Sequence, residues 1–156
     1  MKLRSAAGLA AFLGASAATA GVGSLGSRRA PEQYGRLVKP RWAPPAEVFG
    51  PVWSVLYAAI GLAGWRAWRS GGGAAALALH GVQLALNAAW PAAFFAAGAR
   101  RRALAVNVAL DAAIAAEIAA VWRRDRLAAA VLTPYLAWSL YATALTAAVR
   151  GPSRAH

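Results

Sequence analysis

The chain has 156 residues, of which 60% are hydrophobic and 14% charged, with a net charge of +12 and no cysteine. A soluble domain usually carries about a quarter charged residues, so this composition excludes an ordinary soluble fold. The positive charge does not indicate nucleic-acid binding, because the arginines stand at the ends of apolar segments, where they meet lipid headgroups. Without cysteine the chain has no disulfide, no thiol nucleophile and no thiolate metal site.

Five apolar segments account for nearly the whole chain, and each is long enough to cross a bilayer, which takes about 20 predominantly apolar residues. They cover residues 5–27, 48–68, 74–97, 103–122 and 128–149. The connections after the second segment are short, and short connections make consecutive helices antiparallel neighbours. The sequence therefore predicts an all-α, polytopic membrane protein. Its single domain, residues 1–156, would be an up-and-down bundle of five transmembrane helices.

The first segment has two interpretations. Lys2 and Arg4, followed by an alanine-rich run that ends at Ala20, resemble a cleavable signal peptide. The uncharged run continues past Ala20 to Ser27, however, which suits a complete span better than a short signal sequence. We therefore predict a retained helix.

The Lys and Arg residues differ in number between the two sides of the predicted bundle. The side of the C-terminus carries ten of them and the side of the N-terminus carries seven. Positive residues are enriched in cytoplasmic loops, so this count predicts a cytoplasmic C-terminus. The alanine and arginine richness is typical of a bacterial genome, which indicates a bacterial cell membrane.

Residues 28–47 form the longest connection, and its prolines predict that it has no regular helix, because each fixes φ and removes a backbone donor. These prolines are Pro31, Pro40, Pro44 and Pro45. Tyr34 and Trp42 indicate a loop that packs against the protein, since disordered linkers are poor in aromatic residues. We expect the segment to fold back over one mouth of the bundle as a lid.

The third segment has two distinct faces when its residues are placed at about 100° per position. One face is a ladder of small residues, which allows close helix packing in lipid and predicts a homodimer seam. The ladder comprises Gly81, Ala85, Ala89, Ala93 and Ala97. The opposite face carries Gln83, Asn87, Trp90 and Phe94. Its two amides have two interpretations: interhelical hydrogen bonds, or polar groups in the wall of a pocket.

The second and fifth segments carry similar faces. Trp53 and Tyr57 share one face of the second segment, and Tyr135, Trp138 and Ala142 share one face of the fifth. If the faces of three helices converge, they line a cavity with flat aromatic walls and a few polar contacts. Small-molecule sites have this composition.

The ionisable residues inside the spans do not form recognisable catalytic machinery. Asp111 and Glu117 lie about 120° apart on the fourth segment, so they cannot form one carboxylate pair. We expect each to face protein, with Asn107 as the partner of Asp111; a proton relay is the functional alternative. His80 has no nearby acid in the sequence and is a poor metal ligand, although an axial haem ligand is conceivable. We predict no metal site and no covalently bound cofactor.

Three blocks resemble the signature of the TspO/translocator protein family. The first comprises residues 39–45 (KPRWAPP) and 49–57 (FGPVWSVLY). The second is 83–90 (QLALNAAW) with Phe94 and Phe95, and the third is 134–138 (PYLAW) with 142–145 (ATAL). The blocks fall in order across the second, third and fifth predicted helices.

The resemblance implies a five-helix, commonly homodimeric bundle that binds porphyrins and, in many members, sterols and synthetic ligands. Carried over by motif position, the pocket would use Trp53, Asn87, Phe94, Trp138 and Ala142, with the proline-rich loop as lid. In bacterial relatives the tryptophans that match Trp53 and Trp138 are implicated in light-dependent porphyrin breakdown. Residue faces and resemblance together give the candidate ligand-binding set. It comprises Tyr34, Trp42, Pro44, Trp53, Tyr57, Gln83, Asn87, Trp90, Phe94, Tyr135, Trp138 and Ala142.

Departures from the family pattern concern the lid, one intramembrane amide and the sterol motif. Gln33 stands where the family often has Trp, and Thr146 stands where it has Asn. The sterol motif needs a Tyr shortly before a basic residue. Before Arg150 that Tyr is missing, which argues against cholesterol as the natural ligand.

The sequence therefore predicts a membrane receptor for tetrapyrroles (porphyrin or haem intermediates) and related flat hydrophobic molecules, active in their sensing, transport or disposal. Its expected partners are such a ligand, membrane lipid and a second copy of the chain. A transporter is one alternative, although no internal repeat supports it. The other is an enzyme that degrades porphyrin with light and oxygen.

Overall fold

The structure, a computed structural model, describes residues 2–95 and 100–151. Apart from one antiparallel bridge between Val38 and Arg150, the secondary structure of these residues is helical, which confirms the all-α prediction. The long helices are α1 (Lys2–Gly26), α3 (Phe49–Arg69), α4 (Gly73–Phe95), α5 (Arg100–Trp122) and α6 (Arg126–Ala148). Two short helices precede α3: α2 (Ala30–Arg36) and the 3₁₀ helix η1 (Ala46–Val48).

Four helices of the described chain are long and apolar enough to cross a membrane: α1, α3 together with η1, α5 and α6. This supports an integral membrane protein. The remaining long helix, α4, has 23 residues but carries His80, Gln83 and Asn87 in its middle. These polar side chains lower its hydropathy, and all three are buried inside the bundle.

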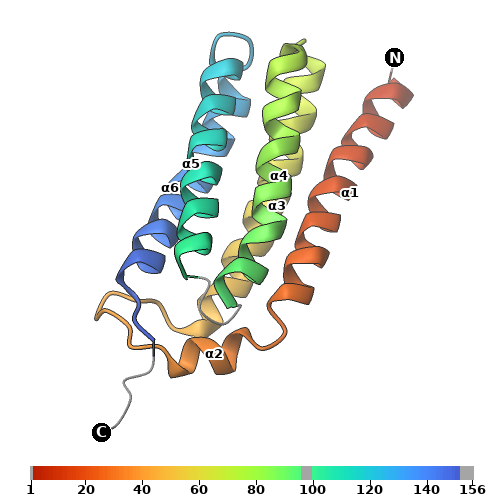
Figure 1. Ribbon diagram of the computed structural model, residues 1–156. Helices are drawn as coiled ribbons and strands as arrows, with labels where there is room; N and C mark the ends of the chain where they lie inside the picture. Colours follow the sequence, from red (N-terminus) through yellow and green to blue (C-terminus); the bar gives the residue numbers. More distant parts are fainter. Residues whose placement is uncertain (1, 96–99, 152–156) are drawn as a thin grey trace, which may run out of the picture.

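The long helices run side by side (Figure 1). Helix α4 packs on α5, α5 on α6, and α6 on α3. Helix α1 lies at one edge, against α3 and α4. Helix α2 crosses the end of the bundle at which α1 and α6 finish (Figure 1). The core between α3, α5 and α6 is centred on Ile60, Ile114, Leu132 and Tyr135, each at most 1% exposed.

The segment before α3 differs from its prediction, because residues 30–36 form helix α2. Pro31 lies in the first turn of α2, where a backbone N–H has no helical acceptor and proline is tolerated. Beyond α2 the chain is irregular as far as η1, as expected. Burial, and secondarily Tyr141, raise the pKa of Tyr34, which therefore stays protonated and donates from its hydroxyl to the carbonyl of Pro44 at 2.8 Å.

The segment is also tied to the far end of the chain. Val38 and Arg150 exchange two backbone hydrogen bonds of 3.1 and 3.0 Å. The hydroxyl of Tyr141 on α6 donates to the carbonyl of Trp42 at 2.9 Å. These bonds hold residues 37–42 against the end of α6, so α2 and the following loop cover one mouth of the bundle.

At the opposite end, Asp125 caps α6 and joins it to α3. Its carboxylate accepts from the backbone N–H of Ala128 at 2.9 Å and pairs with Arg66 at 3.1 Å. Burial alone would raise the pKa of Asp125, but these hydrogen bonds and the guanidinium charge outweigh burial and lower it.

We expect Asp125→Ala to lower the free energy of unfolding by about 1 kcal/mol, the usual cost of losing an N-cap. Because the folded pKa is lowered, the carboxylate stabilises the protein above the unfolded pKa, and this stabilisation is lost as the pH falls through the folded pKa. The difference in unfolding temperature between wild type and variant should therefore be largest near pH 7 and shrink under strongly acidic conditions. A difference independent of pH would contradict the ionised cap.

Candidate functional site

A cavity of about 340 Å³ lies beneath α2, among α1, α3, α4 and α6. This volume falls within the range of small-molecule sites, about 300–1,000 Å³. The cavity is lined by Ala20, Gly23, Ser24, Ser27, Ala30, Pro31, Tyr34, Ala46, Phe49, Gly50, Trp53, Tyr57, Asn87, Trp90, Pro91, Phe94, Phe95, Ala142, Leu145 and Thr146.

Aromatic rings form two walls of this cavity. On α3 the rings of Trp53 and Tyr57 lie 5.3 Å apart, inclined by 30°. On α4 the rings of Trp90 and Phe94 are stacked, with centroids 5.1 Å apart. Each pair is spaced four residues apart, so both rings project from one face of their helix. Such walls suit a flat, hydrophobic ligand.

Asn87 is the main polar group of the cavity. Its Oδ1 accepts from the hydroxyl of Tyr57 at 2.7 Å, and its Nδ2 donates to the hydroxyl oxygen of Tyr135 at 2.8 Å. The amide is thus held by α3 on one side and by α6 on the other. Its orientation, and that of Tyr57, are fixed before any ligand enters.

The structure brings together only part of the predicted ligand-binding set. Seven of its members line the cavity: Tyr34, Trp53, Tyr57, Asn87, Trp90, Phe94 and Ala142. Five do not: Trp42, Pro44, Gln83, Tyr135 and Trp138. Gln83 and Tyr135 are fully buried in the bundle, where the hydroxyl of Tyr135 donates to Oε1 of Gln83 at 2.9 Å.

Trp138 and Trp42 lie outside the cavity wall. The indole of Trp138 packs edge-on against Phe49, which lines the cavity, with centroids 5.9 Å apart. Trp42 is exposed on the loop after α2, against the ring of Tyr141. Of the two tryptophans linked by resemblance to porphyrin breakdown, Trp53 lines the cavity and Trp138 lies one layer behind it.

The contribution of α1 to the site was missed by the sequence analysis. Ala20, Gly23 and Ser24 line the cavity from one face of α1, and Ser27 lines it from the turn that follows. That face of small residues was the available signal. It leaves room for a ligand, because a Cβ on Gly23 would meet only Pro91 and Tyr57, each at 3.6 Å.

Two expectations for the intramembrane polar residues were wrong. Asp111 accepts from Thr143 at 2.6 Å, whereas Asn107, its expected partner, donates to Thr146 at 3.0 Å. His80 does have an acid beside it, because its Nδ1 lies 2.7 Å from Oε1 of Glu117 on α5.

The histidine is poorly placed to ligate a haem or a metal. Its Nδ1 faces Glu117, and its other edge packs against α3 so closely that a Cβ on Gly64 would lie 2.5 Å from Cε1. Within the described ranges no group of three or more His, Cys, Asp or Glu side chains could hold a metal ion.

The small-residue ladder of α4 lies on its outer surface. Gly81, Ala85 and Ala89 are exposed and Ala93 is half-buried, while Ala97 falls outside the described residues. The ladder is therefore available for packing against another chain, and the homodimer seam stays a prediction.

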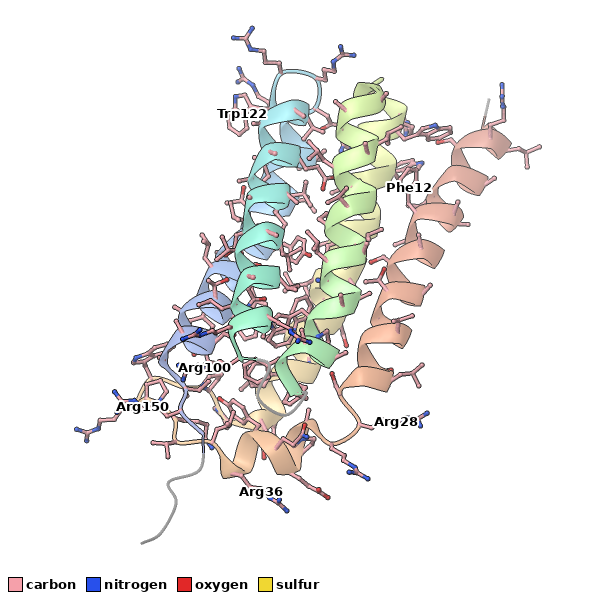
Figure 2. All side chains as sticks on the ribbon, viewed as in Figure 1. Phe12, Arg28, Arg36, Arg100, Trp122 and Arg150 are labelled. Carbon is pink, nitrogen blue, oxygen red and sulfur yellow. The ribbon has the colours of Figure 1, made fainter. Side chains whose placement is uncertain are left out.

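The end of the bundle that holds the cavity is strongly basic. Figure 2 shows Arg28, Arg36, Arg100 and Arg150 at this end and Trp122 at the other. Arg100 donates to the carbonyl of Val149 at 2.6 Å. These four cations lie at the cavity end, where positive charge attracts anionic groups on lipids or ligands.

Comparison with known proteins gives a consistent result. The model of the TspO/MBR family matches residues 9–151. The human "Translocator protein" is 42% identical over 117 residues, which cover 72% of this chain and 69% of the relative. The "Tryptophan-rich protein TspO" of Archaeoglobus fulgidus is 35% identical over 118 residues, 74% of this chain and 76% of its own. The "Tryptophan-rich protein TspO" of Chlorobaculum tepidum is 34% identical over 135 residues, which cover 80% of this chain and 84% of the relative.

Proposed function

Because this chain belongs to the TspO/MBR family, we propose that it is a membrane receptor for tetrapyrroles and related flat hydrophobic ligands. It would bind them in the cavity beneath α2 and act in their sensing, transport or disposal. The observation that carries this proposal is the cavity itself. Pairs of aromatic side chains on α3 and α4 form two of its walls, and Asn87 supplies an oriented polar contact.

The charge around the cavity supports the same ligand class. Porphyrins carry carboxylate groups at the edge of an apolar ring system. Arg28, Arg36, Arg100 and Arg150 at this end of the bundle would attract those carboxylates while the ring enters between Trp53 and Trp90.

The membrane arrangement that we propose has five spans, with α4 as the fifth. Its polar side chains are buried against neighbouring helices, so they do not prevent insertion. The odd number of spans places the termini on opposite sides. The larger number of basic residues near the cavity end makes that end, with the C-terminus, cytoplasmic in a bacterial cell membrane.

The test is titration of the detergent-purified chain with protoporphyrin IX, followed by tryptophan quenching, in wild type and in Ala142→Leu. Ala142 lines the cavity on α6, so the larger side chain should fill part of it. We expect saturable binding by wild type and about tenfold weaker binding by the variant, or roughly 1.4 kcal/mol.

Ala144→Leu is the matched control, because Ala144 lies on the same helix but is exposed to the surroundings. It should bind as wild type does. Absence of saturable binding by wild type, or equal effects of the two substitutions, would contradict the proposed site.

We also propose that two copies associate through the ladder of α4. Close packing of small residues drives helix association in lipid, where the hydrophobic effect between helices is absent. Ala85→Leu should therefore shift the protein from dimer to monomer, as measured by its mass in detergent. Unchanged mass in Ala85→Leu would show that the seam lies elsewhere.

A further inference from the structure

The interior of the bundle holds a histidine–glutamate pair that does not line the cavity. Nδ1 of His80 lies 2.7 Å from Oε1 of Glu117, and the two side chains are only 4% and 0% exposed. An ionisable residue in a membrane helix costs roughly 2.5–3.5 kcal/mol and marks a functional site by default. Among the described residues, no Lys or Arg forms an ion pair with Glu117.

A chain of hydrogen bonds connects this pair to the cavity. The hydroxyl of Tyr57 donates to Asn87 at 2.7 Å, and Nδ2 of Asn87 donates to Tyr135 at 2.8 Å. Tyr135 donates to Oε1 of Gln83 at 2.9 Å, and Nε2 of Gln83 faces Nδ1 of His80 at 3.4 Å. Every donor in the chain points away from the cavity and toward the pair. Because Asn87 follows His80 by seven positions, the hydrogen-bond chain covers about 10 Å along α4.

The direction of this chain depends on the proton between His80 and Glu117. When Glu117 is a carboxylic acid, its O–H donates to Nδ1, and the neutral imidazole carries its own proton on Nε2. The lone pair of Nδ1 then also favours the NH₂ group of Gln83 as its second, longer neighbour at 3.4 Å. When the pair releases one proton, the proton of Nε2 leaves and that of Glu117 passes to Nδ1. Nδ1–H then donates to the carboxylate, and the oxygen of Gln83 is the favoured neighbour of this N–H. Asn and Gln amides exchange their N and O atoms by a half-turn that leaves their shape unchanged. The same framework therefore supports both directions.

The two directions present different groups to a ligand. In the first direction, with Glu117 protonated, the O–H of Tyr57 donates to Asn87, and the oxygen of Tyr57 is left as an acceptor. In the second, Nδ2 of Asn87 donates to that oxygen, and the O–H of Tyr57 becomes a free donor at the cavity wall. Space beside this hydroxyl is provided by Gly23 on α1, where an added Cβ would still lie 3.6 Å away.

Few other ionisable groups of the described chain face the pair. On α3, Arg66 is engaged with Asp125, the N-cap of α6. On α5, Asp111 accepts from Thr143. Helix α6 contributes Tyr135, which is a member of the hydrogen-bond chain. Helix α1 presents the ring of Phe12, 5.6 Å from the imidazole, and has no charged residue after its first turn.

We propose that the His80–Glu117 pair is a proton-binding site that determines whether Tyr57 offers the ligand a hydrogen-bond acceptor or a donor. This inference rests on the proposed function, since it concerns ligand selection in the same cavity. A ligand that offers only acceptors favours the second direction, and its binding therefore displaces one proton from the pair to solvent. Such a ligand binds more tightly as the pH rises.

The first experiment counts the protons released on binding. The probe is the dimethyl ester of protoporphyrin IX, whose edge carries carbonyl acceptors and no ionisable carboxyl. Calorimetric titration of the full chain between pH 5 and 8, in buffers of different ionisation enthalpy, should show proton release. It should also show affinity that rises by up to tenfold per pH unit. Glu117→Gln keeps a donor to Nδ1 but cannot ionise, so its binding should be independent of pH.

Asp111→Asn is the matched control, because it removes the other buried carboxyl of α5, which takes no part in the hydrogen-bond chain. This variant should release protons as wild type does. Equal proton release by wild type and Glu117→Gln would overturn the inference, as would loss of the release in Asp111→Asn.

The second experiment needs no ligand. Trp53 lies beside Tyr57, with ring centroids 5.3 Å apart, so its fluorescence should change when the hydroxyl of Tyr57 changes its partner. The Trp53 contribution, obtained by difference from Trp53→Phe, should show a pH transition in wild type. The transition should be lost in Glu117→Gln and in Tyr135→Phe, which cuts the chain. If the ester does not bind to wild type, the proposed function fails. A missing fluorescence transition in wild type overturns the inference itself.

Discussion

Gly64→Ala is expected to lower the free energy of unfolding by about 3 kcal/mol, the upper end of the usual cost of overpacking a core. A Cβ at this position of α3 would lie 2.5 Å from Cε1 of His80 and 2.7 Å from Cδ1 of Phe12. The imidazole cannot withdraw without breaking its 2.7 Å contact with Glu117. The gain in helix propensity, about 1 kcal/mol at most, does not compensate. Denaturation in detergent, followed by circular dichroism, measures the loss.

Gly21→Ala is the control for this prediction. Gly21 is exposed on α1, and a Cβ there would meet nothing within 4 Å. Alanine should therefore leave stability unchanged or raise it by up to about 1 kcal/mol. If the two variants are equally stable, α3 does not pack against His80 as closely as the structure has it.

The positions of the long helices could be predicted from the sequence, because charged residues mark where each apolar segment ends. The second predicted segment, 48–68, corresponds to α3 (Phe49–Arg69), and the last, 128–149, to α6 (Arg126–Ala148). Helix α2 could not be predicted from the proline count. A single proline is compatible with a helix when it lies in the first turn, as Pro31 does.

The site was harder to predict, because the sequence does not fix how each helix is rotated against its neighbours. Gln83 and Asn87 share one face of α4, yet only Asn87 reaches the cavity, while Gln83 bonds to Tyr135 in the bundle. His80 and Glu117 are 37 residues apart on different helices, so no local pattern pairs them. The small residues of α1 line the cavity by leaving space, and small apolar side chains have no chemical group that would mark them in the sequence as part of a site.

Asn87→Ala should reduce both stability and ligand binding, because this amide joins three helices. Its loss leaves the hydroxyl of Tyr57 without an acceptor and that of Tyr135 without its donor. A hydrogen bond between membrane helices is worth about 0.6 kcal/mol on average, but an unsatisfied buried group costs about 1–3 kcal/mol. Tyr135 is fully buried and cannot turn to water, whereas Tyr57 lines the cavity. We therefore expect a loss of about 2 kcal/mol in the free energy of unfolding.

Binding of protoporphyrin IX by Asn87→Ala should weaken about tenfold, roughly 1.4 kcal/mol, because the variant loses a polar contact and the orientation of Tyr57. Asn107→Ala separates this effect from general loosening of the bundle. Asn107 is equally buried but does not itself line the cavity. Its one hydrogen bond goes to Thr146, a lining residue whose hydroxyl stays anchored without it, because it also donates to the carbonyl of Ala142. That variant should lose about 1 kcal/mol of stability and keep wild-type affinity. If it weakens binding as much as Asn87→Ala does, the affinity depends on the rigidity of the bundle, and Asn87 does not contact the ligand.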